Sequence, residues 1–426
     1  MLPRSILFAL STCCMIVLYS PAIAGTTFGI YDARTLAMGG ASVASANNSN
    51  AQFYNAALLA FNEEIEEKTQ DSRFLFPLLI PRVSESAITL EDLSQDDPIQ
   101  AMTRAVSNFN IEPDEMGAQV VVDVAANLDA ALAELDGEDL TSDIYFGLAV
   151  SEPGKFQGAG FFLGTRLLVG GQSTITAADR AVLAAYQEGL TFVASGGAQG
   201  TEHPEIFDAN GMLIDPGGDF DSTVSAAGAL ITEAGHAMSR QMHLFGHPIA
   251  AGFSFKVMRI DAFEDVERIV DDRIDTERNS EYHGNINFDV GVVKEIGERW
   301  RVALAVKDII PHNYETSLGT PIRLRPRARI GAAYLAGRFQ IAVDADLIEN
   351  EPLGSERPTQ EVALGSEWFF KSPLKFRAGY RQDIRGNRDG VASLGVGTVW
   401  RRLAVDVALA GGSDARAAAL QFGYVF

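Results

Sequence analysis

The stretch FQIAVDADLI, residues 339–348, alternates apolar and polar side chains with a period of two. The apolar face holds Phe339, Ile341, Val343, Ala345 and Leu347, and the other face holds Gln340, Ala342, Asp344 and Asp346. Successive side chains of a β-strand point to opposite sides, so this period is the one expected of a strand. The stretch therefore predicts a strand with one apolar face and one polar, partly charged face.

Related runs recur along the chain, among them NINFDVGVV (285–293), WRVALAVKD (300–308), LKFRAGYR (374–381) and LAVDVALA (403–410). The runs lie near residues 73–83, 142–152, 155–170, 224–238, 247–260, 282–295, 298–308, 325–336, 337–347, 358–370, 373–383, 390–400, 401–411 and 415–426. Alternating runs of about ten residues are typical of a transmembrane β-barrel, although the strands of a soluble sandwich alternate as well. We expect an all-β fold, an outer-membrane barrel of about fourteen antiparallel strands.

The connections between these runs favour the barrel over the sandwich. Short links lie at residues 152–155, 297, 336–337 and 371–372, with a somewhat longer one at 239–246. Long connections occupy residues 84–141, 171–223, 261–281 and 309–324. Outer-membrane barrels have short periplasmic turns and long extracellular loops, whereas a sandwich gives no reason for such asymmetry.

Both ends of the chain fit export to an outer membrane. Residues 1–24 read as a secretory signal with Ala22-Ile23-Ala24 at its cleavage site, a retained membrane anchor being the alternative. The final run, LQFGYVF, places Phe422, Tyr424 and Phe426 on one face. A last strand that ends in an aromatic residue resembles the signal read by the barrel-assembly machinery of Gram-negative outer membranes. The alternative is an ordinary strand that happens to end in phenylalanine.

Composition excludes several other classes of protein. The net charge of −22 argues against nucleic-acid binding and against basic docking on anionic lipid. Both cysteines, Cys13 and Cys14, lie in the signal, so the mature chain has no disulfide and no cysteine metal site. Motifs for a nucleophilic serine, a zinc protease or a phosphate-binding loop are lacking. We expect no enzyme, cofactor or metal, and we interpret the acidic run at 261–277 as a solvated loop.

Two long connections carry helical patterns, at residues 97–109 and 117–135 in the first and 176–190 in the second. Apolar residues recur at helical spacing at Val120, Val124, Leu128, Ala131, Leu132 and Leu135. We expect helical insertions at about 84–141 and 171–223. They either have a function or are surface caps.

The segment MGGASVASANNSNAQFYNAALLA, residues 38–60, is rich in small residues and asparagine. A barrel of about fourteen strands has a lumen that its wall side chains do not fill. Glycine and alanine allow close backbone approach, and asparagine satisfies a polar wall. We therefore expect residues 25–62 to form a plug inside a barrel of residues 63–426; a periplasmic tail is the alternative.

The longer stretch ARTLAMGGASVASANNSNAQFYNAALLA, residues 33–60, resembles the N-terminal signature of the long-chain fatty-acid transporter superfamily. Within it, residues 220–241, 249–265 and 288–311 are most similar to the conjugal-transfer TraF-like outer-membrane proteins. The chain lacks a Cys-x-x-Cys motif, so it does not resemble the thioredoxin-like proteins that share the TraF name.

The resemblance implies a ligand passage beside the plug. The residues it points to are Met38, Gly39, Gly40, Phe53, Tyr54, Asn55 and Leu58. One departure is that Asn55-Ala56-Ala57 stands where the family has Asn-Pro-Ala. Proline fixes its φ angle, so its loss is expected to loosen that turn and puts the family's gating in doubt.

Charged residues on the polar faces of the strands are expected to line the lumen: Arg327, Arg329, Arg377, Arg381, Asp344, Asp346 and Asp406. They either form a salt-bridge network that holds the plug, or the arginines receive the carboxylate of an amphiphile. Two functional hypotheses remain: an outer-membrane barrel that binds or transports fatty-acid-like or hydrocarbon molecules, or a non-transporting component of a conjugation or secretion apparatus. Outer-membrane lipid, the barrel-assembly machinery and a hydrophobic ligand are the expected partners.

Overall fold

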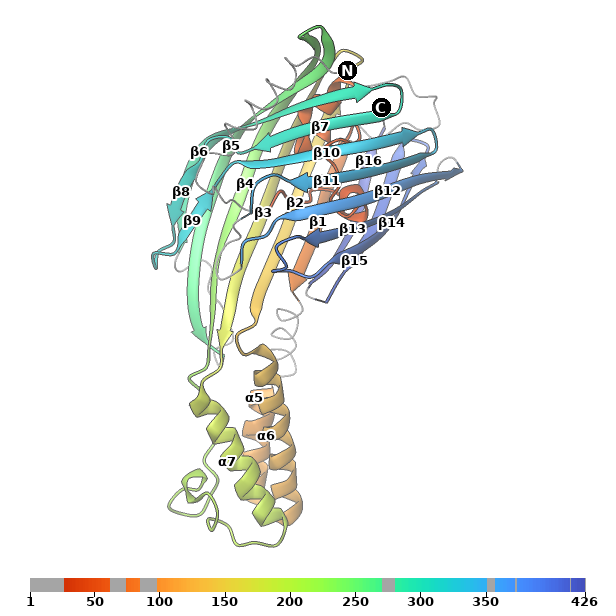
Figure 1. Cartoon of the computed structure of the whole chain (residues 1–426). Helices are drawn as coiled ribbons and strands as arrows, with labels where there is room; N and C mark the ends of the chain where they lie inside the picture. The colour runs from red at the N-terminus through yellow and green to blue at the C-terminus, as the bar shows by residue number, and fades with distance from the viewer. Residues whose placement is uncertain are drawn as a thin grey trace.

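The computed structural model describes residues 27–61, 74–84, 98–269, 280–350, 357–371, 374–413 and 415–425. Within these residues fourteen strands close into an antiparallel barrel, in which β1 pairs with both β2 and β16 (Figure 1). They are β1 (Phe74–Ser84), β2 (Asp139–Glu152), β3 (Gln157–Thr174), β4 (Thr223–Leu244), β5 (His247–Arg268), β6 (Ser280–Ile296), β7 (Trp300–Lys307), β10 (Arg327–Ala336), β11 (Phe339–Asp346), β12 (Glu361–Lys371), β13 (Leu374–Asp383), β14 (Val391–Trp400), β15 (Leu403–Gly411) and β16 (Ala415–Tyr424). The predicted fourteen-strand barrel is confirmed. The expected signal at 1–24 and the last residue, Phe426, lie outside the described residues.

The barrel has its apolar side chains outside and its charges inside. On β13, Phe376 is 40% exposed, whereas its neighbour Arg377 is 4% exposed. Trp300, Trp368 and Trp400 stand half exposed where strands meet the short turns. An apolar outer band that ends in aromatic residues is the surface of a barrel that spans a membrane.

One side of the barrel is much taller than the rest. Strands β4 and β5 have 22 residues each and pair along their whole length, whereas β7 and β11 have eight each. On the outer face of β5, Arg259 is exposed and pairs with Asp261 at 2.8 Å. A charged pair on the outer face marks the end of the apolar band, so the tall wall continues beyond the membrane on the long-loop side.

This tall wall corrects two expectations about loops. Asp261, Glu264, Asp265 and Glu267 belong to β5 and not to a solvated loop, and the rest of the acidic run, residues 270–277, lies outside the described residues. The link expected at 239–246 shrinks to the turn at Phe245 and Gly246, both with positive φ. The strands run on because β4 and β5 satisfy each other's backbone hydrogen bonds beyond the membrane.

Three helices form a bundle at the long-loop end, far from the two termini (Figure 1). They are α5 (Pro98–Ile111), α6 (Glu115–Leu135) and α7 (Ala177–Ala194). Among the described residues, α6 alone is long and apolar enough to cross a membrane, and it packs with its two neighbours around a buried core. Val120, expected in the apolar stripe, is 49% exposed because the buried face runs through Val121, Ala125 and Leu128.

Residues 27–60 fold inside the barrel as α2 (Ala33–Ala37), α3 (Ala51–Tyr54) and the 3-10 helix η1 (Ala56–Ala60). Nearly all of these residues are buried. Asp32 caps α2, because its carboxylate accepts a hydrogen bond from the Thr35 N–H at 2.9 Å. Most side chains of this plug are small, so most of the plug contacts the wall only where its backbone can approach the wall backbone closely.

Wall glycines provide that close approach. A Cβ atom at Gly379 would collide with the backbone of Met38 and Gly39, and one at Gly252 with the backbone of Ala56 and Ala57. Gly158 and Gly365 also face plug backbone, and Gly291 and Gly395 face the side chains of Asn55 and Ala37. The small residues of the plug and the glycines of the wall are thus two halves of one backbone contact.

Substitution of one wall glycine tests this contact. Gly379→Val is expected to destabilise the folded protein by about 1–3 kcal/mol, because the added methyl groups force the plug backbone away. Gly284→Val is the matched control, since a Cβ at Gly284 meets nothing within 4 Å. Thermal unfolding of both variants in detergent measures the effect, and equal melting temperatures would contradict the close contact.

Candidate functional site

The candidate site is the lumen, and its centre is a cluster of aromatic rings shared by plug and wall. Tyr31 stacks on Phe53 with ring centroids 5.6 Å apart and meets Tyr145 of β2 edge-on at 5.0 Å. The Tyr54 hydroxyl donates to Asp32 at 2.7 Å and accepts the Tyr31 N–H at 2.7 Å. Two predicted residues, Phe53 and Tyr54, therefore fix the fold of the plug itself.

The predicted residues Met38, Gly39 and Gly40 lie where the plug touches β12 and β13, and Leu58 is buried in η1. The Asn55 side chain stabilises the turn in which Ala56 stands where the family has proline. Its amide donates to the Val43 carbonyl at 3.0 Å, and its oxygen accepts the Ala57 N–H at 3.1 Å. Two side-chain hydrogen bonds thus hold this turn, and whether it is looser than in the family stays a prediction.

A first group of buried charges fastens α2 to the wall. Arg34 of the plug pairs with Glu367 of β12 at 3.1 Å. Arg377 bridges the same Glu367 and Asp406 of β15, each at 2.5 Å. Removing one partner of such a buried pair typically costs about 3–5 kcal/mol, so these contacts hold the plug in one position.

A second group lies around β10 to β13. Asp344 accepts the N–H groups of Ser42 and Val43 at 2.7 and 2.8 Å. Arg329 pairs with Asp346 at 2.5 Å and with Glu361 at 3.2 Å. Arg381 also pairs with Glu361, at 3.3 Å, and Arg329 lies 4.7 Å from the ring centre of Phe28.

A third group surrounds Lys256 of β5, which is 1% exposed. Its ammonium lies 2.6 Å from Asp308 and 2.9 Å from Asp289. Arg327 also pairs with Asp308, and it donates to the Thr27 carbonyl of the plug at 2.6 Å. The seven predicted lumen charges thus all lie among ion pairs or plug contacts.

Sequence reasoning missed Arg34, Glu367 and Lys256 of these groups. It also missed two cations at the plug, Lys307 and Arg166; Arg166 pairs with Asp143 at 2.7 Å and donates to the Thr27 hydroxyl at 2.8 Å. Lys307 donates to the Tyr31 hydroxyl at 3.1 Å and to the Phe53 carbonyl at 3.0 Å. A signal was present, because Lys307 lies on the polar face of WRVALAVKD. No such signal marks Arg34, because the plug does not alternate polar and apolar residues as the strands do.

The long-loop side of the lumen is covered by a hairpin that the sequence did not predict, β8 (His312–Glu315) with β9 (Pro321–Leu324). The chain turns at Asp308, whose φ is +53°. Tyr314, Ile322 and Leu324 then pack on inward-facing residues of the tall wall. These wall residues are Leu168, Ala229, Met258, Ile260 and Ala262.

Polar contacts hold the hairpin against the wall. Thr316 and Thr320 both donate to Glu264 of β5, at 2.5 and 2.8 Å. Asn285 of β6 donates to the Tyr314 hydroxyl at 2.5 Å. A short hairpin thus covers an apolar patch inside the lumen. These hydrogen bonds and apolar contacts hold the hairpin in place.

Between this patch and the plug lies a cavity of about 20 Å³. Its lining includes Tyr31, Tyr145, Arg166, Glu233 and Arg327. In the described part of the chain, the Tyr145 hydroxyl and the Arg327 Nε find no hydrogen-bond partner. The cavity has room for about one water molecule, so a larger molecule does not fit there in this conformation.

Comparison with known proteins gives a family. The family model described as "F plasmid transfer operon, TraF, protein" matches residues 52–346, more than half of the chain. No curated protein matches the chain.

Solved barrels are similar in fold. The Pseudomonas putida toluene transporter TodX has 10% identity and a TM-score of 0.45, with 95% of this chain and 100% of that chain covered. A Pseudomonas aeruginosa FadL homologue has 10% identity and a TM-score of 0.47, with 96% and 100% covered. A mutant of the Rh. blastica porin has 15% identity and a TM-score of 0.29, with 67% and 91% covered.

Deletion of the plug tests whether it closes the lumen. A variant lacking residues 27–60 is expected to conduct ions in planar bilayers, because the wall side chains of a barrel this wide do not fill it. The intact chain should stay closed. A variant that migrates as a folded barrel on unheated gels, yet stays as silent as the intact chain, would show that something other than the plug closes the lumen.

Proposed function

The chain belongs to the F plasmid transfer operon TraF family, and we propose that it is an outer-membrane barrel that binds hydrophobic or amphiphilic small molecules in its lumen and passes them inward. One observation carries this proposal: the apolar patch beneath the hairpin β8–β9, which lies directly above a cavity lined by arginines. The signature shared with the long-chain fatty-acid transporter superfamily supports the same ligand class.

The patch and the cavity together suit a molecule with an alkyl chain and an anionic head. Leu168, Met258 and Ile260 provide apolar surface on the inner wall, where the hairpin covers it. Arg166 and Arg327 line the cavity next to it. A guanidinium binds a carboxylate through charge-assisted hydrogen bonds, and the apolar wall gains from the burial of the chain.

Binding requires the hairpin to move, because its own apolar side chains occupy the place of the ligand. The chain enters the hairpin through the left-handed turn at Asp308, whose buried carboxylate stays paired with Lys256 and Arg327, so the movement lies beyond this residue. A ligand would replace the contacts of Ile322 and Leu324 with those of its alkyl chain. Passage further inward requires the plug contacts around Tyr31 to loosen in turn.

Ligand binding by the full-length chain in detergent tests the proposal. Hexadecanoate and hexadecanol are titrated by calorimetry into the intact protein and into Met258→Gln, which places an amide in the apolar patch. We expect affinity for both ligands to fall about tenfold in the variant, because polar surface replaces part of the apolar contact. Met242→Gln is the matched control, since Met242 is exposed near the short turn after β4.

A second variant distinguishes binding of the ligand's anionic head group from binding of its alkyl chain. Arg166→Gln should weaken hexadecanoate and leave hexadecanol unchanged, because only the former carries a charge. Absence of hexadecanoate binding to the intact protein, or binding that Met258→Gln leaves unchanged, would overturn the proposal.

One observation favours the second candidate, a non-transporting component of a conjugation apparatus. Three groups of buried ion pairs and the wall glycines hold the plug from several sides. The family model, described by a transfer operon, points the same way. In that case cells carrying the chain would take up hexadecanoate no faster than cells without it, and hexadecanoate would not affect the hairpin.

A further inference from the structure

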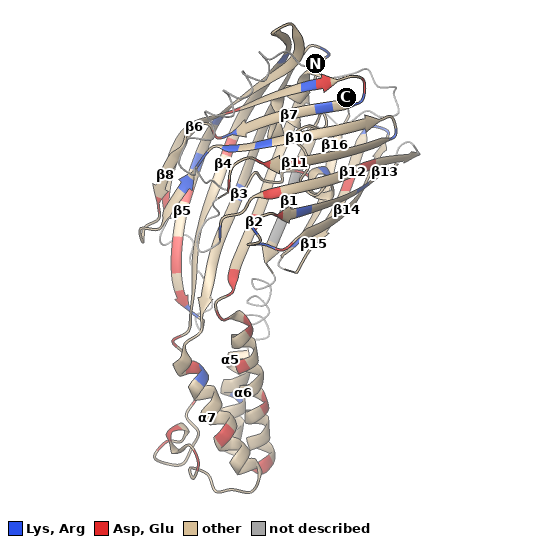
Figure 2. Cartoon of the chain, in the orientation of Figure 1, with Lys and Arg blue, Asp and Glu red and all other residues tan. Residues whose placement is uncertain are grey.

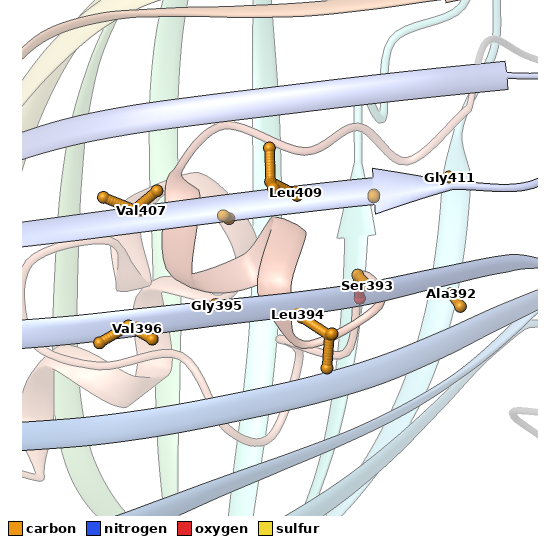
Figure 3. Close-up of a pocket in the computed structure, with 10 residues that line it drawn as sticks. Ala392, Ser393, Leu394, Gly395, Val396, Val407, Leu409 and Gly411 are labelled. Carbon is orange, nitrogen blue, oxygen red and sulfur yellow. The ribbon is translucent and has the colours of Figure 1, made fainter.

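The membrane-facing wall carries a groove that is separate from the lumen. It has a volume of about 490 Å³ and is lined by residues 392–396 of β14 and 407–411 of β15. Figure 3 shows that Leu394 and Leu409 point away from each other, as do Val396 and Val407. The two strands stay fully paired, so the floor of the groove is their hydrogen-bonded backbone and its sides are these splayed side chains.

The groove lies on the outer face and not in the lumen. Leu394 and Leu409 are register partners and are 67% and 62% exposed. The alternate residues of the same strands point inward: the Ser393 hydroxyl donates to the Ala37 carbonyl of the plug at 3.1 Å. The space above the floor is therefore filled by the membrane, and its lining is almost entirely apolar.

The groove opens toward the long-loop end. Ala392 and Gly411 are register partners at that end, and neither has a side chain long enough to close it. Trp400 stands at the opposite, short-turn end of β14. Five strand residues extend about 15 Å, so the groove follows a substantial part of one membrane leaflet. Long loops of such barrels are extracellular, which places the groove in the outer leaflet.

A cation stands at the open end. Arg416 of β16 is the register partner of Gly411 and is exposed. Its position shares the outward parity of Leu420 and Phe422 on the same strand. An apolar channel along the wall with a guanidinium at its extracellular end matches an acyl chain that carries an anionic head.

We propose that the β14–β15 groove binds one acyl chain of an anionic lipid of the outer leaflet, with Arg416 beside its head group. A volume of 490 Å³ lies in the range of specific ligand sites. The site is independent of the proposed lumen ligand.

Native mass spectrometry of the delipidated full-length chain tests the site, with phosphatidylglycerol as the anionic probe and phosphatidylcholine of the same acyl chains as the zwitterionic one. We expect one phosphatidylglycerol molecule to be retained. Ala392→Phe, which fills the groove, should lower its retention at least about tenfold, as the apolar contact is lost. Arg416→Gln should lower phosphatidylglycerol retention about two- to fivefold, the effect of one exposed ion pair, and leave phosphatidylcholine unchanged.

Two controls separate this site from other causes. Ala345→Phe makes the same substitution on the outward face of β11 and should leave retention unchanged. Met258→Gln, which alters the lumen, should do the same, so failure here is distinct from failure of the proposed lumen function.

The groove site would be overturned by full retention in Ala392→Phe, by equal loss in Ala345→Phe, or by a lipid-free dimer whose formation Ala392→Phe abolishes. The last result would assign the groove to a second copy of the chain. Binding of free hexadecanoate in place of phosphatidylglycerol, with loss in Ala392→Phe, would also contradict a lipid site and assign the groove to a soluble amphiphile.

Discussion

The fit between the plug backbone and the glycines of the wall is the constraint on which the rest of the structure depends. A barrel of fourteen strands encloses more space than its own side chains fill. Small plug residues bring backbone against backbone at Gly379, Gly252 and other wall positions. That closeness in turn places Arg34, Tyr31 and the Ser42 N–H within reach of the wall charges, so packing and electrostatics specify the same position of the plug.

The barrel strands differ in length, and the longest ones carry the apolar patch. The short barrel strands β7 and β10 to β16 form little more than the membrane band, whereas β3 to β6 extend beyond it. The inner face of this tall wall holds the apolar patch, and its loops lead into the helical bundle, along which acidic residues lie in Figure 2. The apolar patch, the hairpin that covers it and the exposed helical bundle therefore lie at the long-loop end of the molecule, and the plug lies further inward.

Most of the fold could be read from the sequence because a strand in a barrel wall imposes a strict period of two. WRVALAVKD and FQIAVDADLI show that period, and their boundaries in the structure differ by one or two residues from those expected. The hairpin β8–β9 was not predicted, since its four-residue strands are too short to show a period. The partners of the predicted lumen charges, such as Glu367 for Arg377, depend on strand register across the barrel, which no local pattern contains.

Amide hydrogen exchange of the full-length chain in detergent, with and without hexadecanoate, would test the central claim most directly. The account predicts that the amides of Ser42 and Val43 exchange as slowly as those of the wall strands, because Asp344 holds them. It also predicts that hexadecanoate changes exchange in residues 312–324 of the hairpin before it changes exchange in the plug. Plug amides that exchange as fast as exposed loops, or a hairpin that does not respond to the ligand, would contradict it.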